Sequence, residues 1–218
     1  MPKSRTLSGL RLMIYDATEK RWGRLFNLSL IWRIGGWLYR LLGRLDRHHG
    51  ATSWADALVW LGTVEPARPI AEIQYWGHGR WGRALISDES MDIRCLDPRH
   101  VMYKHLHRIR SRLVANDSTH RERALWWFRT CETLGAECGQ EFAMAWADFF
   151  NCRVAGHTHV IGFYQSGLHS LRSGESPTWS ASEGIIEGDA AKPSRAAESR
   201  RCLLNTITCF GGRVPNGW

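Results

Sequence analysis

Three short runs of apolar residues constrain the fold of this chain more than any other feature. They read "LRLMIYDA" (10–17), "IAEIQYW" (70–76) and "ALWWF" (124–128), and charged or turn-forming residues bound them. The first two runs are typical of strands, and the unbroken third run is typical of a strand buried on both faces. Parallel strands need long crossover connections, which helices usually supply. Strand-like runs that alternate with helical segments therefore predict an α/β layer architecture with a mainly parallel central sheet.

The segment "RLFNLSLIWRIGGWLYRLLGRLDR" (24–47) has a helical pattern. One helical face carries four arginines, and leucine, isoleucine, tryptophan and tyrosine residues occupy the rest of the circumference; the arginines are Arg33, Arg40, Arg44 and Arg47. The Gly-Gly pair at 35–36 weakens the middle of this helix and predicts a kink or a break. We expect the tryptophan and leucine side chains to be buried against the sheet. A basic amphipathic helix that lies on a membrane surface is the alternative.

The rest of the chain alternates between helical and strand-like patterns, without an internal repeat. Ser53 is expected to be the N-cap of a second helix. Helices are predicted over 54–62, 99–113 and from 136 onward, a hairpin over 80–89, and strands over 152–164 and 202–210, the last returning to the core. Residues 187–201 are small and charged, so we expect a mobile loop there. All of these elements fit a single domain that spans residues 1–218.

The charge and the cysteines limit the partners and the compartment that we expect. The formal net charge is +8, but the chain contains no arginine-rich arm, zinc-finger spacing or aromatic RNA-binding motif. No stretch has the length and apolar content of a membrane-spanning helix, and the N-terminus lacks the apolar core of a secretory signal. We therefore expect a cytoplasmic protein with reduced cysteines and with neither nucleic acid nor a membrane as its partner. No C-x-x-C pair is present, so no structural zinc is expected.

The three apolar runs are followed by polar residues with catalytic chemistry. Asp16 ends the first run, His78 lies between two glycines after the second, and Cys131 follows the third. Because functional groups gather beyond the carboxyl ends of parallel strands, we expect these three side chains at one edge of the sheet. A thiol, an imidazole and a carboxylate are the components of nucleophilic cysteine catalysis. A helix that starts near Gly135 would direct its positive end toward Cys131 and favour the thiolate.

The motifs "IQYWGHG" (73–79) and "LWWFRTCETLG" (125–135) resemble the caspase-like fold of the clan that includes caspases, metacaspases, gingipains and clostripain. In that fold one strand ends in a histidine–glycine pair, and the next core strand ends in the cysteine nucleophile. The resemblance runs from Leu10 to about Gly184 and is closest to bacterial caspase-like domains of unassigned function. It implies a three-layer α/β sandwich that hydrolyses a peptide bond. By this resemblance His78 is the general acid/base, Cys131 is the nucleophile, and the N–H groups of Gly79 and Cys131 form the oxyanion hole.

The sequence around the cysteine departs from that family's pattern in two ways. Peptidases of the clan commonly have a glycine shortly after the cysteine, whereas Glu132, Thr133 and Leu134 here precede Gly135. An acidic neighbour opposes formation of a thiolate. Metacaspase-like members have an acidic residue two positions before the cysteine, where this chain has Arg129. If Arg129 faces a pocket, an acidic substrate group is expected there; a structural ion pair is the alternative.

The segment "AGHTH" (155–159) is a second histidine cluster. His157 and His159 share a face if the segment is a strand. Two histidines without a carboxylate at fixed spacing make a weak metal signal, so we expect no metal and no cofactor. Instead, we expect this segment to form the wall of a substrate pocket. The residues assigned to that pocket are Asp16, Arg129, Glu132 and His157.

These patterns leave three functions open. The first is a hydrolase that uses the His78–Cys131 dyad on a peptide or protein substrate. The second is a catalytically inactive caspase-like domain that binds a partner. The third is a basic protein associated with a membrane surface or with nucleic acid, in which the cysteine is incidental. The two glycines beside His78 favour the first, because they suit a substrate-binding turn better than they suit packing.

Overall fold

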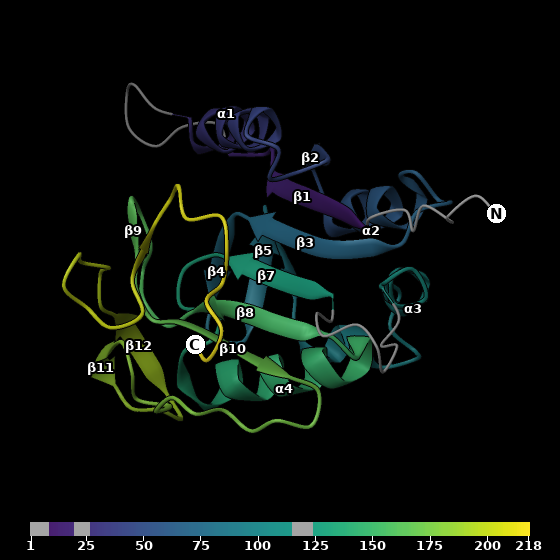
Figure 1. Ribbon diagram of the computed structural model, residues 1–218. Coiled ribbons are helices and arrows are strands. Elements are labelled where there is room, and N and C mark those ends of the chain that lie inside the picture. Colours follow the sequence, from purple (N-terminus) through teal and green to yellow (C-terminus); the bar gives the residue numbers. More distant parts are fainter. Residues whose placement is uncertain (1–8, 20–26, 115–123) are drawn as a thin grey trace.

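The structure is a computed structural model that describes residues 9–19, 27–114 and 124–218 (Figure 1). Its centre is a six-stranded sheet with the strand order β10-β8-β7-β3-β1-β2. The strands are β1 (Leu10–Asp16), β2 (Arg47–Ala51), β3 (Ile70–Trp76), β7 (Leu125–Arg129), β8 (Arg153–His157) and β10 (Leu168–Arg172). All neighbouring pairs are parallel except β8 and β10, which are antiparallel. The predicted α/β fold with a mainly parallel sheet is confirmed, and β1, β3 and β7 are parallel neighbours as expected.

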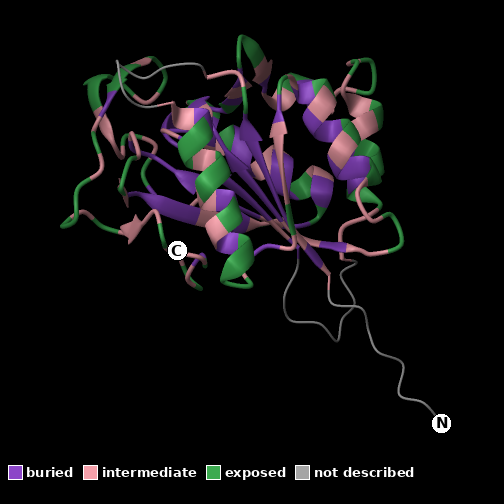
Figure 2. Ribbon diagram, turned by 90° about the horizontal axis from the view of Figure 1, so that it is seen from above, coloured by how far each residue is buried: buried purple, intermediate pink, exposed green. Residues whose placement is uncertain are grey.

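The two faces of the sheet are buried under different helices. Side chains alternate along β1, so Leu12 and Ile14 belong to one buried cluster, whereas Met13 and Tyr15 belong to another. The helices of the first cluster are α2 (Trp54–Thr63), α3 (Tyr103–Arg110) and α4 (Ala136–Phe150), and that of the second is α1 (Leu28–Leu41). Figure 2 shows the buried strands at the centre, with exposed residues on the surrounding helices and loops. Helices therefore cover both faces of the sheet.

The boundaries of two helices test the sequence patterns directly. The hydroxyl of Ser53 accepts a 3.1 Å hydrogen bond from the backbone N–H of Asp56, so the predicted N-cap of α2 is confirmed. The predicted helix over 24–47 is shorter: its first residues lie outside the described part of the chain, and β2 begins at Arg47. The Gly-Gly pair does not break α1. Instead it allows close packing, because a Cβ at Gly35 would lie 2.9 Å from the Trp76 ring.

The expected burial of the tryptophan and leucine side chains is wrong for much of α1. Trp37 is 60% exposed and Leu41 is 65% exposed, whereas Tyr39 is buried against the sheet. Apolar residues occupy most of the circumference of this helix, and the sheet covers only one side of it. The remaining apolar side chains therefore face outward.

A three-stranded antiparallel sheet follows β3 directly. It consists of β4 (His78–Arg80), β5 (Arg83–Ile86) and β6 (Glu89–Met91), so the hairpin expected after β3 is confirmed. A short 3-10 helix, η1 (Ile93–Leu96), leads from β6 toward α3. The helix predicted over 99–113 is shorter in the structure: α3 runs from Tyr103 to Arg110, and turns flank it on both sides.

The C-terminal third differs most from its predictions. Of residues 202–210 only β13 (Ile207–Thr208) is a strand, and it pairs with β9 (Tyr164–Gln165). Ile207 packs against a buried cluster, whereas Leu204 is 85% exposed, so only part of the segment returns to the core. A turn interrupts this segment, because the Thr206 hydroxyl donates a 2.7 Å hydrogen bond to the Leu203 carbonyl. The segment 187–201, for which we expected a mobile loop, contains β12 (Pro193–Ala196), which pairs with β11 (Ile185–Gly188). The last place in the central sheet belongs to β10, which the sequence patterns did not indicate.

No helix formed by the described residues combines the length and the apolar content that crossing a membrane requires.

Candidate active site

The parallel sheet brings the ends of β1, β3 and β7 to one edge. Tyr15 pairs with Trp76, and Trp76 pairs with Arg129, so the three strands end level with one another. The chain then continues from these strands into Asp16, the His78–Gly79 pair and Cys131. The expected gathering of the three segments at a single edge therefore follows from the register (Figure 1).

Gly79 lies directly against the loop that carries Cys131. A Cβ at Gly79 would lie 2.7 Å from the Thr130 Cβ and closer still to the Thr133 hydroxyl oxygen. The two threonine hydroxyls form a 2.5 Å hydrogen bond with each other, and that of Thr133 also donates to the Cys131 carbonyl at 3.1 Å. Only glycine fits at this position. The histidine–glycine motif and the cysteine loop are therefore packed together, as the oxyanion-hole hypothesis for Gly79 and Cys131 requires.

Cys131 is partly buried and its thiol is protonated at neutral pH. Burial raises the pKa of the thiol to about 11, and the neighbouring Glu132 carboxylate acts in the same direction. The Sγ atom lies 3.9 Å from the Ile161 carbonyl oxygen, which accepts the weak S–H hydrogen bond. The helix that follows, α4, was expected to favour the thiolate, but desolvation outweighs that effect. The resting site therefore holds a thiol.

His78 is oriented by a carboxylate that the sequence analysis did not single out. Its Nε2 atom lies 3.0 Å from Oε1 of Glu19, and the Trp32 ring of α1 meets the imidazole edge to face at 5.7 Å between centroids. A carboxylate on one ring nitrogen fixes the tautomer and leaves Nδ1 for other contacts. Glu19 lies just beyond β1, and the only available signal was an acidic residue near the end of a predicted strand.

Glu132 occupies a strained and poorly solvated position. Its backbone has φ +31°, in the left-handed region that non-glycine residues rarely adopt, and its N–H donates to the His159 carbonyl at 3.0 Å. The side chain is 9% exposed, and its Oε2 atom has no hydrogen-bond partner. Burial raises the pKa of this carboxyl to about 7, although the charge of Arg80 acts against the shift. Glu132 is therefore close to half ionised at neutral pH.

The Asp16 carboxylate is held by hydrogen bonds within the protein and is not directed into an open pocket. One oxygen of the Asp16 carboxylate accepts hydrogen bonds from the Thr18 N–H and hydroxyl, and the other accepts one from the Ser87 N–H at 3.2 Å. Asp16 is 1% exposed and fastens the segment after β1 to the turn between β5 and β6. Both of its oxygens are already used by the fold.

Arg129 is enclosed by neutral groups. Its guanidinium donates to the Tyr39 hydroxyl and to Gln165 Oε1, at 2.8 Å each, and to the Cys209 carbonyl at 3.0 Å. The guanidinium carbon also lies over the Trp76 and Trp127 rings, 4.4 and 4.5 Å from their centroids. The Arg129 side chain thus links β7 to α1, to Gln165 and to the segment at Cys209, and its described partners include no carboxylate in ion-pair contact. Neither the open pocket nor the ion pair considered for Arg129 is found among its described contacts; neutral acceptors hold its guanidinium instead.

The histidines of the second cluster are buried, and burial lowers the pKa of both. His157 is fully buried, its Nδ1 lies 3.1 Å from the Ser166 carbonyl, and desolvation lowers its pKa to about 3. The strand β8 carries His157, whereas His159 lies beyond the strand and contacts the Thr158 hydroxyl. The described residues contain no group of three histidine, cysteine or acidic side chains able to hold a metal ion. His157 is therefore closed off from solvent and does not line an open pocket.

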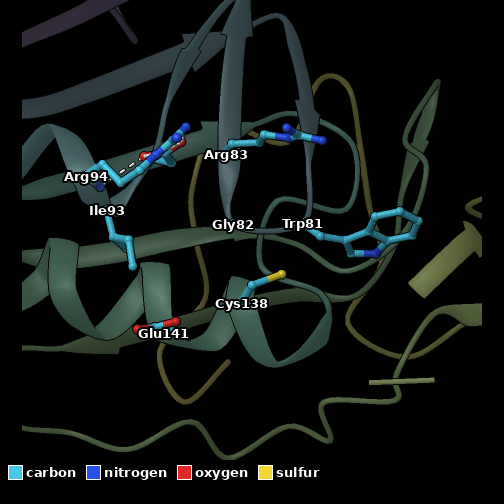
Figure 3. A pocket seen from close by; sticks show the side chains of 8 residues that line it. Trp81, Gly82, Arg83, Ile93, Arg94, Cys138 and Glu141 are labelled. Carbon is cyan, nitrogen blue, oxygen red and sulfur yellow. Dashed lines mark hydrogen bonds and ion pairs between the residues drawn. The ribbon is translucent and has the colours of Figure 1, made fainter. Parts of the chain in front are cut away.

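A hollow of about 320 Å³ lies next to the cysteine loop (Figure 3). Its wall includes the β4–β5 turn at Trp81 and Gly82, together with Cys138 and Glu141 of α4. The Gly82 N–H donates a 2.9 Å hydrogen bond to the Thr133 carbonyl, which joins this wall to the loop after Cys131. None of the site residues assigned from the sequence lines the hollow.

Comparison of the chain with protein-family models, with curated proteins and with solved structures finds no match in any of the three.

Proposed function

We propose that this chain is a cysteine hydrolase of the caspase-like type, which cleaves a peptide bond with Cys131 as nucleophile and His78 as general acid/base. The proposal rests on one observation: Gly79, next to His78, is in close contact with the threonines that flank Cys131. The two motifs come from neighbouring parallel strands and meet beyond their carboxyl ends. The mainly parallel sheet, with helices on both faces, also suits the three-layer sandwich that the resemblance implies.

The reaction has two steps. In the first, the Cys131 Sγ atom bonds to the carbonyl carbon, the thiol proton passes to His78, and the C–N bond breaks as His78 protonates the leaving amine. In the second, water adds its hydroxyl to the acyl carbon and the thiol is regenerated with the remaining proton. The N–H groups of Gly79 and Cys131 would stabilise the negative oxygen in both steps. Glu19 supports the charged imidazole, as the third member of a catalytic triad does.

An electrophilic peptide probe tests the proposal on the full chain. We expect the probe to label Cys131 ahead of the other cysteines, although Cys138 and Cys202 are exposed and react first with iodoacetamide, a small non-directed reagent. Labelling of Cys131 should fall strongly in His78→Ala and less in Glu19→Gln. His107→Ala, which removes an exposed histidine of α3, is the matched control and should leave labelling unchanged. Labelling spread over several cysteines and insensitive to His78→Ala would contradict a hydrolase.

A catalytically inactive binding domain is the second candidate, and the protonated thiol favours it. A thiol whose burial raises the pKa to about 11 is a weak nucleophile until a substrate changes its surroundings. The two candidates differ in the effect of Glu132→Gln. In a hydrolase, removal of the neighbouring charge should increase labelling of Cys131, whereas in an inactive domain neither form should react with the peptide probe.

A further inference from the structure

The outward side of α1 carries a continuous row of apolar residues. We call this row, together with the arginines beside it, the α1 surface. Its apolar members are Leu30, Ile31, Ile34, Trp37, Leu41 and Leu42, each at least 45% exposed. In Figure 2 the helix lies in front of the sheet, with exposed residues along its length. Single exposed apolar residues are common, but a contiguous row on one helix marks a surface that binds something.

The spacing places this row opposite the buried side of the helix. Residues 30, 34, 37 and 41 follow the i, i+4, i+7, i+11 pattern of one helical face. The opposite face carries Ser29, Gly36 and Tyr39, which are buried against the protein. α1 is therefore apolar on two sides, and within the described residues the sheet satisfies only one of them. Helix α3 provides a contrast, because its apolar residues Leu106 and Ile109 are both buried.

Positive charge accompanies the apolar row. The sequence of α1 contains no acidic residue. Arg33 and Arg40 are exposed, and neither forms an ion pair with any described residue. At 100° per residue both lie to the same side of the row formed by residues 34, 37 and 41. The free cations therefore line one border of the apolar row.

A hollow of about 320 Å³ opens at the C-terminal half of this surface. Trp37, Leu41 and Leu45 supply apolar atoms to it, and Arg40 and Arg47 supply positive charge. Its one acidic residue, Asp46, is already engaged: it accepts a 2.8 Å hydrogen bond from the Arg11 N–H. Arg47 is paired with Glu65 at 2.8 Å, whereas Arg40 forms no ion pair with the part of the chain that the structure describes. An apolar wall beside a free guanidinium is complementary to a phosphate group with an attached acyl chain.

We propose that α1 is an interfacial helix that binds the surface of an anionic phospholipid bilayer. The apolar row enters the boundary between headgroups and acyl chains, and Arg33 and Arg40 contact lipid phosphates. Two exposed aromatic residues extend the surface beyond the end of the helix. Phe210, whose carbonyl accepts a 2.5 Å hydrogen bond from Arg44, contacts Phe163 with ring centroids 6.0 Å apart. A membrane suits this surface better than a nucleic acid does, because the arginines border an apolar row instead of a row of polar groups.

Vesicle flotation of the full chain tests the proposal. We expect the protein to float with vesicles of phosphatidylcholine and phosphatidylserine and to stay behind with phosphatidylcholine alone, since the charge of the lipid attracts the arginines. Ile34→Ser/Trp37→Ser and Arg33→Glu/Arg40→Glu should each lower the apparent affinity by roughly tenfold or more, because each removes one of the two attractions. All four side chains are exposed, so these changes should leave the melting temperature unaltered.

The matched control changes the same charge on another helix. Lys104→Glu/Arg108→Glu reverses two exposed cations of α3 and shifts the net charge by the same amount as the α1 double reversal. It should retain binding to anionic vesicles. No flotation of the unaltered chain, or an equal loss in the α1 and α3 variants, would overturn the proposal. So would a dimer in sedimentation equilibrium that Ile34→Ser/Trp37→Ser dissociates, because a second copy would then cover the α1 surface.

Discussion

The contact between Gly79 and the cysteine loop makes a sharp prediction about Gly79→Ala. The added methyl would lie 2.7 Å from the Thr130 Cβ, and closer still to the Thr133 hydroxyl oxygen. A Cβ atom is fixed to the backbone and cannot turn aside, and the 2.5 Å hydrogen bond between the hydroxyls holds Thr133 in place. Overpacking of a well-packed site costs about 1–3 kcal/mol, and the rigidity of both neighbours places this substitution near 3 kcal/mol. For a domain of this size, such a loss lowers Tm by roughly 6–12 °C.

Thermal unfolding of single and double variants measures this contact. Gly162→Ala is the matched control, because a Cβ there meets nothing within 4 Å and its backbone is not in the left-handed region; it should leave Tm nearly unchanged. Thr133→Ala alone should cost about 1 kcal/mol for its lost hydrogen bonds. In Gly79→Ala/Thr133→Ala the closest clash is relieved, so the double variant should be about 1 kcal/mol more stable than the sum of the singles implies. If Gly79→Ala proves as harmless as Gly162→Ala, the two motifs are not in contact and the candidate site does not exist.

Three further predictions concern buried ionisable groups. Burial raises the pKa of Glu132 to about 7, so the folded state holds its proton more tightly than the unfolded chain, whose ordinary value is 4.5. Stability should therefore fall by up to about 3 kcal/mol as pH rises from 4.5 to 7, and urea unfolding should show Glu132→Gln to be the more stable protein at pH 8. Burial lowers the pKa of His157 to about 3, so His157 has the opposite effect on the pH dependence of stability. The free energy of unfolding should decrease as pH falls from 6.5 toward 3, because the unfolded chain then binds a proton that the folded protein does not. His157→Asn should flatten this part of the pH profile measured by urea unfolding. Arg129→Ala should lower the free energy of unfolding by about 3 kcal/mol, because it leaves Gln165 and the Cys209 carbonyl without a donor and removes contacts with two tryptophan rings. Urea unfolding measures this loss, and a value under about 1 kcal/mol would mean that these contacts contribute little.

Local sequence patterns predicted the framework of the fold. The run at 70–76 is β3 to the residue, and Ser53 caps α2 where the pattern placed a cap. Both succeed because a strand's apolar run and an N-cap depend on residues close together in the chain. Parallel pairing then brings the segments after β1, β3 and β7 to one edge, so the neighbourhood of His78 and Cys131 followed from the sequence as well.

What the site residues do was decided only by the tertiary structure. Arg129 was expected to face a pocket or an ion pair, yet its partners Tyr39 and Cys209 lie 90 and 80 residues away in the chain. The protonated state of Cys131 depends on burial of its thiol by the rest of the fold, which no local pattern describes. Helical periodicity showed which residues of α1 share a face, but not which faces the rest of the protein covers. Periodicity is a property of neighbouring residues, whereas burial and pKa values depend on whatever the fold brings against them from elsewhere in the chain.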